Sequence, residues 1–158
     1  MKRNKQIWIL LSLMSLLLVA CNNDIIYDKQ KEISNTEWNF DDVKKFNINI
    51  EDTLEYVDFY IIIRNTIDYK YANLFLFLTT MTPNNDVSHD TLQFLLADME
   101  GKWLGDGTGN FRENVFLFQH GIQFSQKGTY SFEFTQAMRD TSLIGVSDIG
   151  IRIEKAKE

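Results

Sequence analysis

The chain has few of the residues on which several classes of protein depend. It has a single cysteine, Cys21, so no disulfide can form within one molecule. It has two histidines, His89 and His120, and a transition-metal site would need both of them together with carboxylates. This scarcity argues against a zinc site and against Ser-His-Asp catalysis. With one proline, Pro83, the chain also lacks the composition of a disordered stalk.

Basic residues are in the minority. The 16 lysines and arginines face 22 aspartates and glutamates, which gives a formal charge of −6. An acidic chain is poorly suited to nucleic acid, which selects basic surfaces. It is equally unsuited to electrostatic attachment to anionic lipid. The sequence therefore argues against both kinds of partner.

The N-terminus has the pattern of a secretory signal peptide. Three basic residues among the first five precede an apolar run over residues 7–20, which is shorter than the roughly 20 residues that a membrane-spanning helix needs. The run ends in Leu18-Val19-Ala20-Cys21, which resembles the lipobox of bacterial lipoproteins at all four positions. The resemblance implies cleavage before Cys21, lipidation of its thiol and acylation of its new amine. The alternative is an unused thiol that follows an ordinary secretory signal.

We predict three parts: a lipoprotein signal peptide over residues 1–20, a lipidated tether over residues 21–37 and a β-sandwich domain over residues 38–158. Removal of the signal peptide takes three basic residues and no acids, so the formal charge falls from −6 to −9. Each buried acyl CH₂ contributes about 0.8 kcal/mol, and lasting attachment needs more than one chain. A multiply acylated Cys21 would meet that need, and the remainder has the length of one domain.

Apolar residues alternate with polar ones through most of the chain after Trp38. Such a period of two is typical of half-buried strands. It appears over residues 46–50, 56–63, 91–96, 130–135 and 149–154, with a short mixed segment at 115–119. Residues 74–78 are apolar on both faces, which predicts a central strand, and residues 83–86 and 126–128 have the composition of turns. No helix is predicted beyond a turn near residues 40–44. The pattern predicts an all-β, antiparallel two-sheet sandwich of jelly-roll type.

The span from residue 98 to residue 114 is weakly periodic, so we predict a long loop there. Its segment 105–109 resembles a phosphate-binding loop but lacks the lysine and the following helix, which favours a flexible turn. Four oxygen-bearing side chains of the span could serve Ca²⁺, although their spacing does not match an EF-hand: Asp98, Glu100, Asp106 and Asn110. Acidic residues in a chain of this charge usually form a solvated face, which is the interpretation that we favour. We predict no cofactor and no metal.

Several segments together resemble the conserved segments of one known family. The first is Arg64-Asn65-Thr66-Ile67-Asp68-Tyr69-Lys70-Tyr71-Ala72-Asn73, which runs into the apolar residues 74–76 and is fairly specific only together with the Trp103-Leu104-Gly105 loop. The other matches follow in order: Asp90-Thr91-Leu92, Ala97-Asp98, Gly101, Trp103-Leu104-Gly105, Gly107, Gly128-Thr129-Tyr130, Gln136-Ala137-Met138-Arg139 and residues 145–154. With the lipobox, they cover nearly the whole chain, and together they resemble the gliding-motility lipoprotein GldH family of Bacteroidota.

The resemblance implies a lipoprotein accessory of the gliding apparatus, which is coupled to type IX secretion at the cell envelope. It implies no catalytic residue, and it leads us to expect non-catalytic contact with envelope proteins. The residues Asn22-Asn23-Asp24 lack the dense acidic run that resembles a surface-export signal in some Bacteroidota lipoproteins. We therefore expect a membrane-anchored domain that faces the periplasm.

Seven residues are candidates for contact with a partner or ligand: Arg64, Asn65, Asp68, Tyr69, Lys70, Tyr71 and Trp103. The charged members of the segment 64–70 could instead form a local network that stabilises a loop. Trp103 could be a lid on the core or an exposed anchor. Two other functions stay open at this point. One is a carbohydrate-binding module that stacks Trp103, Tyr69 and Tyr71 on sugars, and the other is a small hydrolase with two close carboxylates.

Overall fold

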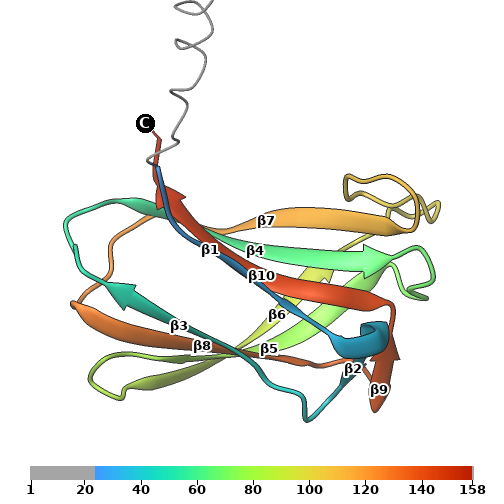
Figure 1. Cartoon of the computed structure of the whole chain (residues 1–158), viewed down its shortest axis with the longest axis horizontal. Helices are drawn as coiled ribbons and strands as arrows, with labels where there is room; N and C mark the ends of the chain where they lie inside the picture. The colour runs from blue at the N-terminus through green and yellow to red at the C-terminus, as the bar shows by residue number, and fades with distance from the viewer. Residues whose placement is uncertain (1–23, 158) are drawn as a thin grey trace, which may run out of the picture.

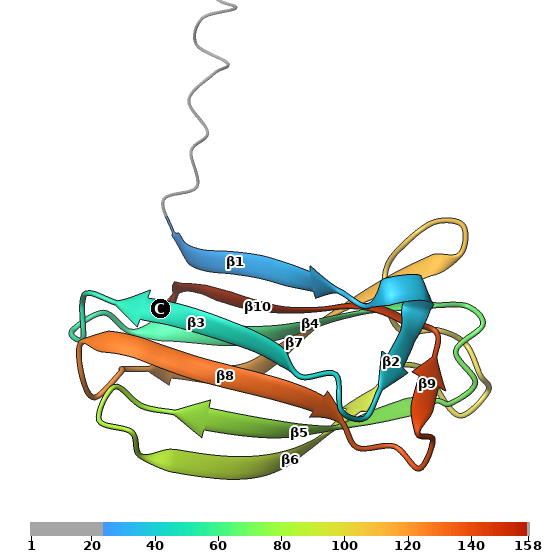
Figure 2. The same ribbon diagram turned by 60° about the horizontal axis from the view of Figure 1, so that its bottom comes forward.

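The computed structural model describes residues 24–157, which form two antiparallel four-stranded sheets packed face to face (Figure 1). The first sheet has the order β1-β10-β4-β7, with strands Ile25–Glu32, Val146–Lys155, Val57–Thr66 and Phe111–Ile122. The second has the order β3-β8-β5-β6, with strands Lys44–Ile50, Gly128–Gln136, Asn73–Met81 and Val87–Leu95. Figure 2 shows the two sheets as separate layers. The predicted all-β sandwich is confirmed.

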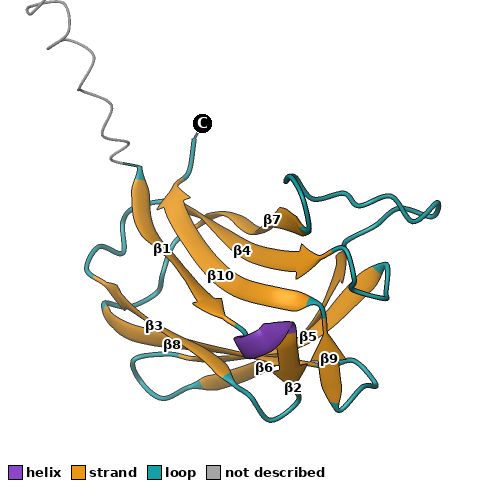
Figure 3. Ribbon diagram, turned by 45° about the vertical axis from the view of Figure 1, so that its right-hand side comes forward, coloured by secondary structure: helices purple, strands orange, loops and turns teal. Residues whose placement is uncertain are grey.

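The chain passes from one sheet to the other at each connection between the eight long strands except the β5–β6 hairpin. This is the connectivity of a jelly roll. A short third pairing joins β2 (Glu37–Asn39) to β9 (Ser142–Ile144) beside the 3₁₀ helix η2 (Ser34–Thr36), as Figure 3 shows. It closes one end of the sandwich over Trp38, whose side chain is fully buried and donates from its Nε1 to the carbonyl oxygen of Asp42.

The core lies between the two sheets and is built by the alternation that the sequence shows. Phe59, Ile61 and Ile63 of β4 point into it from the first sheet, and alternate leucines of β5 meet them from the second. The central position of β5 is confirmed by its pairing with both β6 and β8. Its second apolar face is nevertheless open to solvent, since Phe77 is exposed there.

The N-terminal boundary of the domain differs from the prediction. Residues 25–32 are not a tether, because β1 pairs with β10 over its whole length, from Ile25 opposite Glu154 to Glu32 opposite Asp148. No pattern in the sequence marks this edge strand, because almost all its side chains are exposed and no apolar alternation is needed. The predicted signal peptide and Cys21 lie outside the described residues.

Two further differences concern loops. The last residues of the predicted loop 98–114 belong to β7, which begins at Phe111 and is much longer than the predicted segment 115–119. The alternation of this edge strand is hidden because Phe111, Val115 and Leu117 lie on its exposed face while the polar Asn114 is buried. The helical turn expected near residues 40–44 is a plain turn, and the 3₁₀ helix lies earlier, at Ser34–Thr36.

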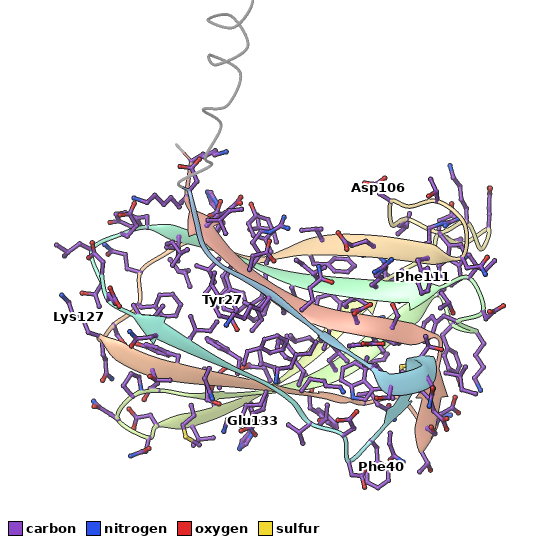
Figure 4. The ribbon with its side chains drawn as sticks, in the orientation of Figure 1. Tyr27, Phe40, Asp106, Phe111, Lys127 and Glu133 are labelled. Carbon is purple, nitrogen blue, oxygen red and sulfur yellow. The ribbon has the colours of Figure 1, made fainter. Side chains whose placement is uncertain are left out.

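The strands run between two ends of the sandwich, which have different roles below. The near end carries Asp24, the β3–β4 loop (residues 51–56) and the β7–β8 connection, where Figure 4 labels Lys127. The far end carries the β4–β5 loop, the β6–β7 loop and the β2–β9 pair, where Figure 4 labels Phe40, Asp106 and Phe111. Within residues 24–157, no helix has the length and apolar character needed to span a membrane.

Candidate functional site

All seven candidate contact residues lie at the far end of the sandwich. Arg64 and Asn65 lie among the last residues of β4, just before its end at Thr66. The residues Asp68 to Tyr71 belong to the β4–β5 loop, and Trp103 lies in the β6–β7 loop. The structure brings the aromatic members together, since the Tyr69 ring centroid lies 5.8 Å from that of Tyr71 and 6.5 Å from that of Trp103. Of the charged members, Lys70 lies next to this cluster, with its Nζ 5.2 Å from the centre of the Tyr71 ring, whereas Arg64 has separate surroundings.

Arg64 lies on the outer face of the first sheet. Its guanidinium carbon is 4.6 Å from the centre of the Phe111 ring, and its Nη1 is 3.9 Å from a carboxylate oxygen of Asp148. Stacking of arginine on an aromatic face fixes the guanidinium without neutralising it. Among the described residues no ion pair joins Arg64 or Lys70 to Asp68. The local ion-pair network that the sequence suggested is therefore wrong, because both bases pair with acids from distant strands and loops.

Asn65 is fully buried and has a structural role. Its Oδ1 accepts a hydrogen bond of 3.1 Å from Nδ2 of Asn114, a diagonal neighbour on β7, and its own Nδ2 donates to the Thr66 carbonyl. Gly105 lies directly over this amide pair, since a Cβ there would come within 2.7 Å of Asn114 Nδ2. The pair satisfies buried polar atoms of both side chains, and the β6–β7 loop can lie close over it because Gly105 has no side chain. Asn65 is not available to a partner.

Tyr69 is also buried, with 3% of its surface exposed. Its hydroxyl donates a 2.8 Å hydrogen bond to the carbonyl oxygen of Asn73, and burial raises the pKa of the phenol. Gly145 packs against its backbone, where a Cβ would come within 2.7 Å of the Tyr69 Cα. Tyr69 therefore fixes the β4–β5 loop to the start of β10 and cannot present its ring face to a sugar.

Lys70 and Tyr71 meet at one carboxylate, that of Asp140. The Lys70 Nζ lies 2.8 Å from Asp140 Oδ2, and the Tyr71 hydroxyl donates to the same oxygen at 2.9 Å. These hydrogen bonds lower the pKa of Asp140, and the bond to Asp140 raises the pKa of Lys70. The loop that carries Asp140 is held in turn by Gln136, whose Nε2 donates to the Asp140 carbonyl. Lys70 remains largely exposed, so its charge faces solvent.

Trp103 is half-buried and packs on the core beside Tyr69. Its backbone pairs with Ala97 across the base of the β6–β7 loop, and the Leu104 amide donates to the Leu96 carbonyl. This is the position of a lid on the core. Part of the indole still reaches the surface.

The proposed calcium ligands do not gather around one point. The Asp98 carboxylate accepts hydrogen bonds from the backbone amides of Glu100 and Lys102, so it shapes its own turn. In the part of the chain that the structure describes, no three His, Cys, Asp or Glu side chains form a group that could hold a metal. The two histidines lie on different sheets, His89 beside Thr79 and His120 beside Asp58.

Comparison with known proteins identifies the family. The family model described as "GldH lipoprotein" matches residues 25–153, which is most of the chain. The chain belongs to the GldH lipoprotein family. The match begins at the first residue of β1, which agrees with a domain that starts at this strand.

Two curated GldH relatives match over nearly their full length. The "Gliding motility lipoprotein GldH homolog" of Christiangramia forsetii is 33% identical over 89% of this chain and 90% of its own. The "Gliding motility lipoprotein GldH" of Flavobacterium johnsoniae is 28% identical over 92% of this chain and 94% of its own. A solved β-fructofuranosidase from Schwanniomyces occidentalis is 10% identical, with a TM-score of 0.37, over 87% of this chain but 35% of its own. That likeness is too low to support an inference about activity.

Sequence reasoning found the GldH signature segment but missed the residues that hold it. Asp140, Asp148 and Asn114 contact it from elsewhere in the sandwich, and of these only Asp148 lies in a segment that resembles the family. Gly145 did carry a signal, because it opens the last of the segments that resemble the family. The far end is thus a charged surface, on which Asp68 and Lys70 are exposed, Arg64 is partly exposed, and the β6–β7 loop adds Glu100, Lys102 and Asp106.

Proposed function

We propose that this GldH-family chain is a lipoprotein of the gliding-motility machinery and its associated type IX secretion, and that it acts by non-catalytic contact with an envelope protein. In this proposal Cys21 carries the lipid, the domain faces the periplasm and the far end meets the partner. The family match over the whole sandwich supports it most directly, together with relatives that are named gliding motility lipoproteins.

The composition of the far end supports protein contact there. Besides its charges, it exposes apolar side chains that the core does not use: Phe40, Ile67, Met99, Leu104 and Ile144. Apolar side chains surrounded by charged ones are typical of surfaces that bind proteins. The buried contacts of Tyr69 and Asn65 keep this surface in one shape, so a partner would meet it with little reorganisation.

Site-specific photocrosslinking in intact cells tests the proposal, with a photoreactive phenylalanine at Phe40 or at Phe77. The two side chains are matched, at 56% and 52% exposed, but Phe77 lies in the middle of β5, away from both ends. We expect a discrete crosslinked envelope protein from Phe40 and none from Phe77. Equal crosslinking at both positions, or none at Phe40, would contradict contact through the far end.

The anchor is tested separately. We expect Cys21→Ser to move the protein from the membrane fraction to the soluble fraction, and mass spectrometry of the wild-type protein to find acyl chains on Cys21. An unmodified Cys21 in the wild-type protein would refute the lipidation on its own, whatever the crosslinking shows.

A further inference from the structure

The β3–β4 loop, residues 51–56, exposes two large side chains at the near end. Leu54 is 81% exposed and Tyr56 is 59% exposed. The loop forms a wall of two hollows of about 430 Å³ each, one bordered by His120 and the other by Phe124. It therefore projects from the sandwich with open space on both sides.

The exposure of Leu54 is not the result of a loose loop. Its backbone amide donates to the Asp52 carboxylate at 2.9 Å, and its carbonyl accepts from the Gln123 side chain at 2.8 Å. The Tyr56 carbonyl accepts from the Ala156 amide at 2.8 Å. A hydrogen bond within the loop and two from other parts of the near end, at Gln123 and Ala156, thus fix a loop that holds an apolar side chain out in solvent. Such exposure costs free energy unless something covers the side chain.

The loop lies close to the place where the chain leads back toward Cys21. The Lys155 amide donates to the Asp24 carbonyl, and on its other side Lys155 pairs with Val57, the residue after Tyr56. Asp24 and Tyr56 are therefore about two strand spacings apart, or roughly 10 Å. Cys21 precedes Asp24 by three residues, which span at most about 11 Å even when fully extended. A lipid on Cys21 would hold the near end, including this loop, at the bilayer surface.

We propose that Leu54 and Tyr56 insert into the interfacial layer of the bilayer in which the lipid of Cys21 is anchored, and so give the domain a second point of attachment. The inference rests on the proposed lipidation. Tyrosine and leucine suit this layer, where an apolar body and a polar tip are both satisfied. The loop also carries Glu51, Asp52 and Glu55, of which only Glu55 has an ion pair among the described residues, with Lys155. Insertion is therefore driven by apolar contact with neutral lipid and not by charge.

Because Cys21 is the only cysteine of the chain, one introduced thiol can be labelled selectively. Lipidation blocks the Cys21 sulfur, so Leu54→Cys would create one free thiol, which can carry a polarity-sensitive NBD fluorophore. Met99→Cys is the matched control, since Met99 is fully exposed at the far end. Both lipidated proteins are reconstituted in phosphatidylcholine vesicles, with or without a nitroxide-labelled lipid as quencher. We expect the label at position 54 to show blue-shifted emission and to be quenched several-fold more than the label at position 99.

Each other result counts against the insertion. Equal spectra and quenching at the two positions would refute it while leaving lipidation intact. Stronger quenching after phosphatidylglycerol replaces part of the phosphatidylcholine, reversed by salt, would show attachment by charge and would also refute it. A free thiol in the wild-type protein would refute the lipidation and, with it, the insertion. The absence of a free thiol in the wild-type protein, together with blue-shifted emission and quenching at position 54 alone, supports both the lipidation and the insertion.

Discussion

Gly145 offers the sharpest test of how the far end is held together. Its φ is +100°, a region that residues with side chains rarely adopt, and a Cβ would come within 2.7 Å of the Tyr69 Cα and 2.8 Å of the Tyr69 nitrogen. Its backbone is fixed on both sides, because its amide donates to the Thr36 carbonyl and its carbonyl accepts from the Thr66 amide. The added methyl group of Gly145→Ala therefore meets backbone and not a side chain that can rotate away.

Two costs add in this variant. A positive φ costs a residue with a Cβ about 1–2 kcal/mol, and forcing a methyl group into a packed site costs about 1–3 kcal/mol. The smaller entropy of the unfolded alanine chain offsets roughly 0.4–1 kcal/mol of this. We therefore expect Gly145→Ala to lower the free energy of unfolding by about 2–4 kcal/mol, a large part of the 5–15 kcal/mol typical of a domain.

Urea unfolding followed by circular dichroism measures this, on a soluble form that begins at Asp24. With an m-value of about 1.5 kcal/mol/M, a loss of 3 kcal/mol would lower the midpoint by about 2 M. Gly101→Ala is the control, since Gly101 has a similar φ of +82° but no atom within 4 Å of the point where a Cβ would lie. The free energy of unfolding of Gly101→Ala should fall by no more than the cost of the positive φ, about 1–2 kcal/mol. Equal losses in the two variants would refute the close contact between Gly145 and Tyr69.

Three further substitutions test individual contacts. Tyr69→Phe removes the hydrogen bond to the Asn73 carbonyl and should lower the free energy of unfolding by about 1 kcal/mol in urea, with the fold unchanged by circular dichroism. Ser131→Ala should leave stability unchanged or raise it by up to about 1 kcal/mol, because the buried Ser131 hydroxyl has no hydrogen-bond partner within residues 24–157. Lys70 lowers the pKa of Asp140 in the folded protein. The stabilisation from this pair should therefore be complete at a pH above the ordinary carboxyl pKa of the unfolded chain, and it should be lost as the pH falls through the lowered pKa of the folded protein. Asp140→Asn should remove that acid-dependent loss in unfolding experiments at a series of pH values, and an unchanged pH profile would refute the role of the pair.

The strands that could be predicted are those with one face in the core. In β3, Phe46, Ile48 and Ile50 are buried while the residues between them are exposed, so burial imposes the alternation that the sequence displays. The edge strand β1 obeys no such constraint. Its stability comes from backbone hydrogen bonds to β10, which almost any side chain allows, and no periodicity could reveal it.

The candidate site, like the fold, could be predicted only in part. The segment from Arg64 to Tyr71 could be located, because it resembles the signature segment of the GldH family and lies between two apolar strands. Its contacts could not, because a jelly roll joins residues far apart in the chain, such as Tyr71 and Asp140, which are 69 positions apart. With 16 basic and 22 acidic residues in the chain, a single sequence does not say which acid faces which base.

The separation of the two ends gives the proposed attachment a physical consequence. β4 has ten residues and spans roughly 33 Å, from Val57 at the near end to Thr66 at the far end. Charges more than about 8 Å apart are largely screened at physiological ionic strength. A domain held upright by Cys21 and Leu54 would therefore keep Arg64 and Lys70 outside the field of the lipid headgroups. With the lipid alone, the domain could lie against the bilayer and lose that separation. Contact by the β3–β4 loop is what would direct the far end toward a partner.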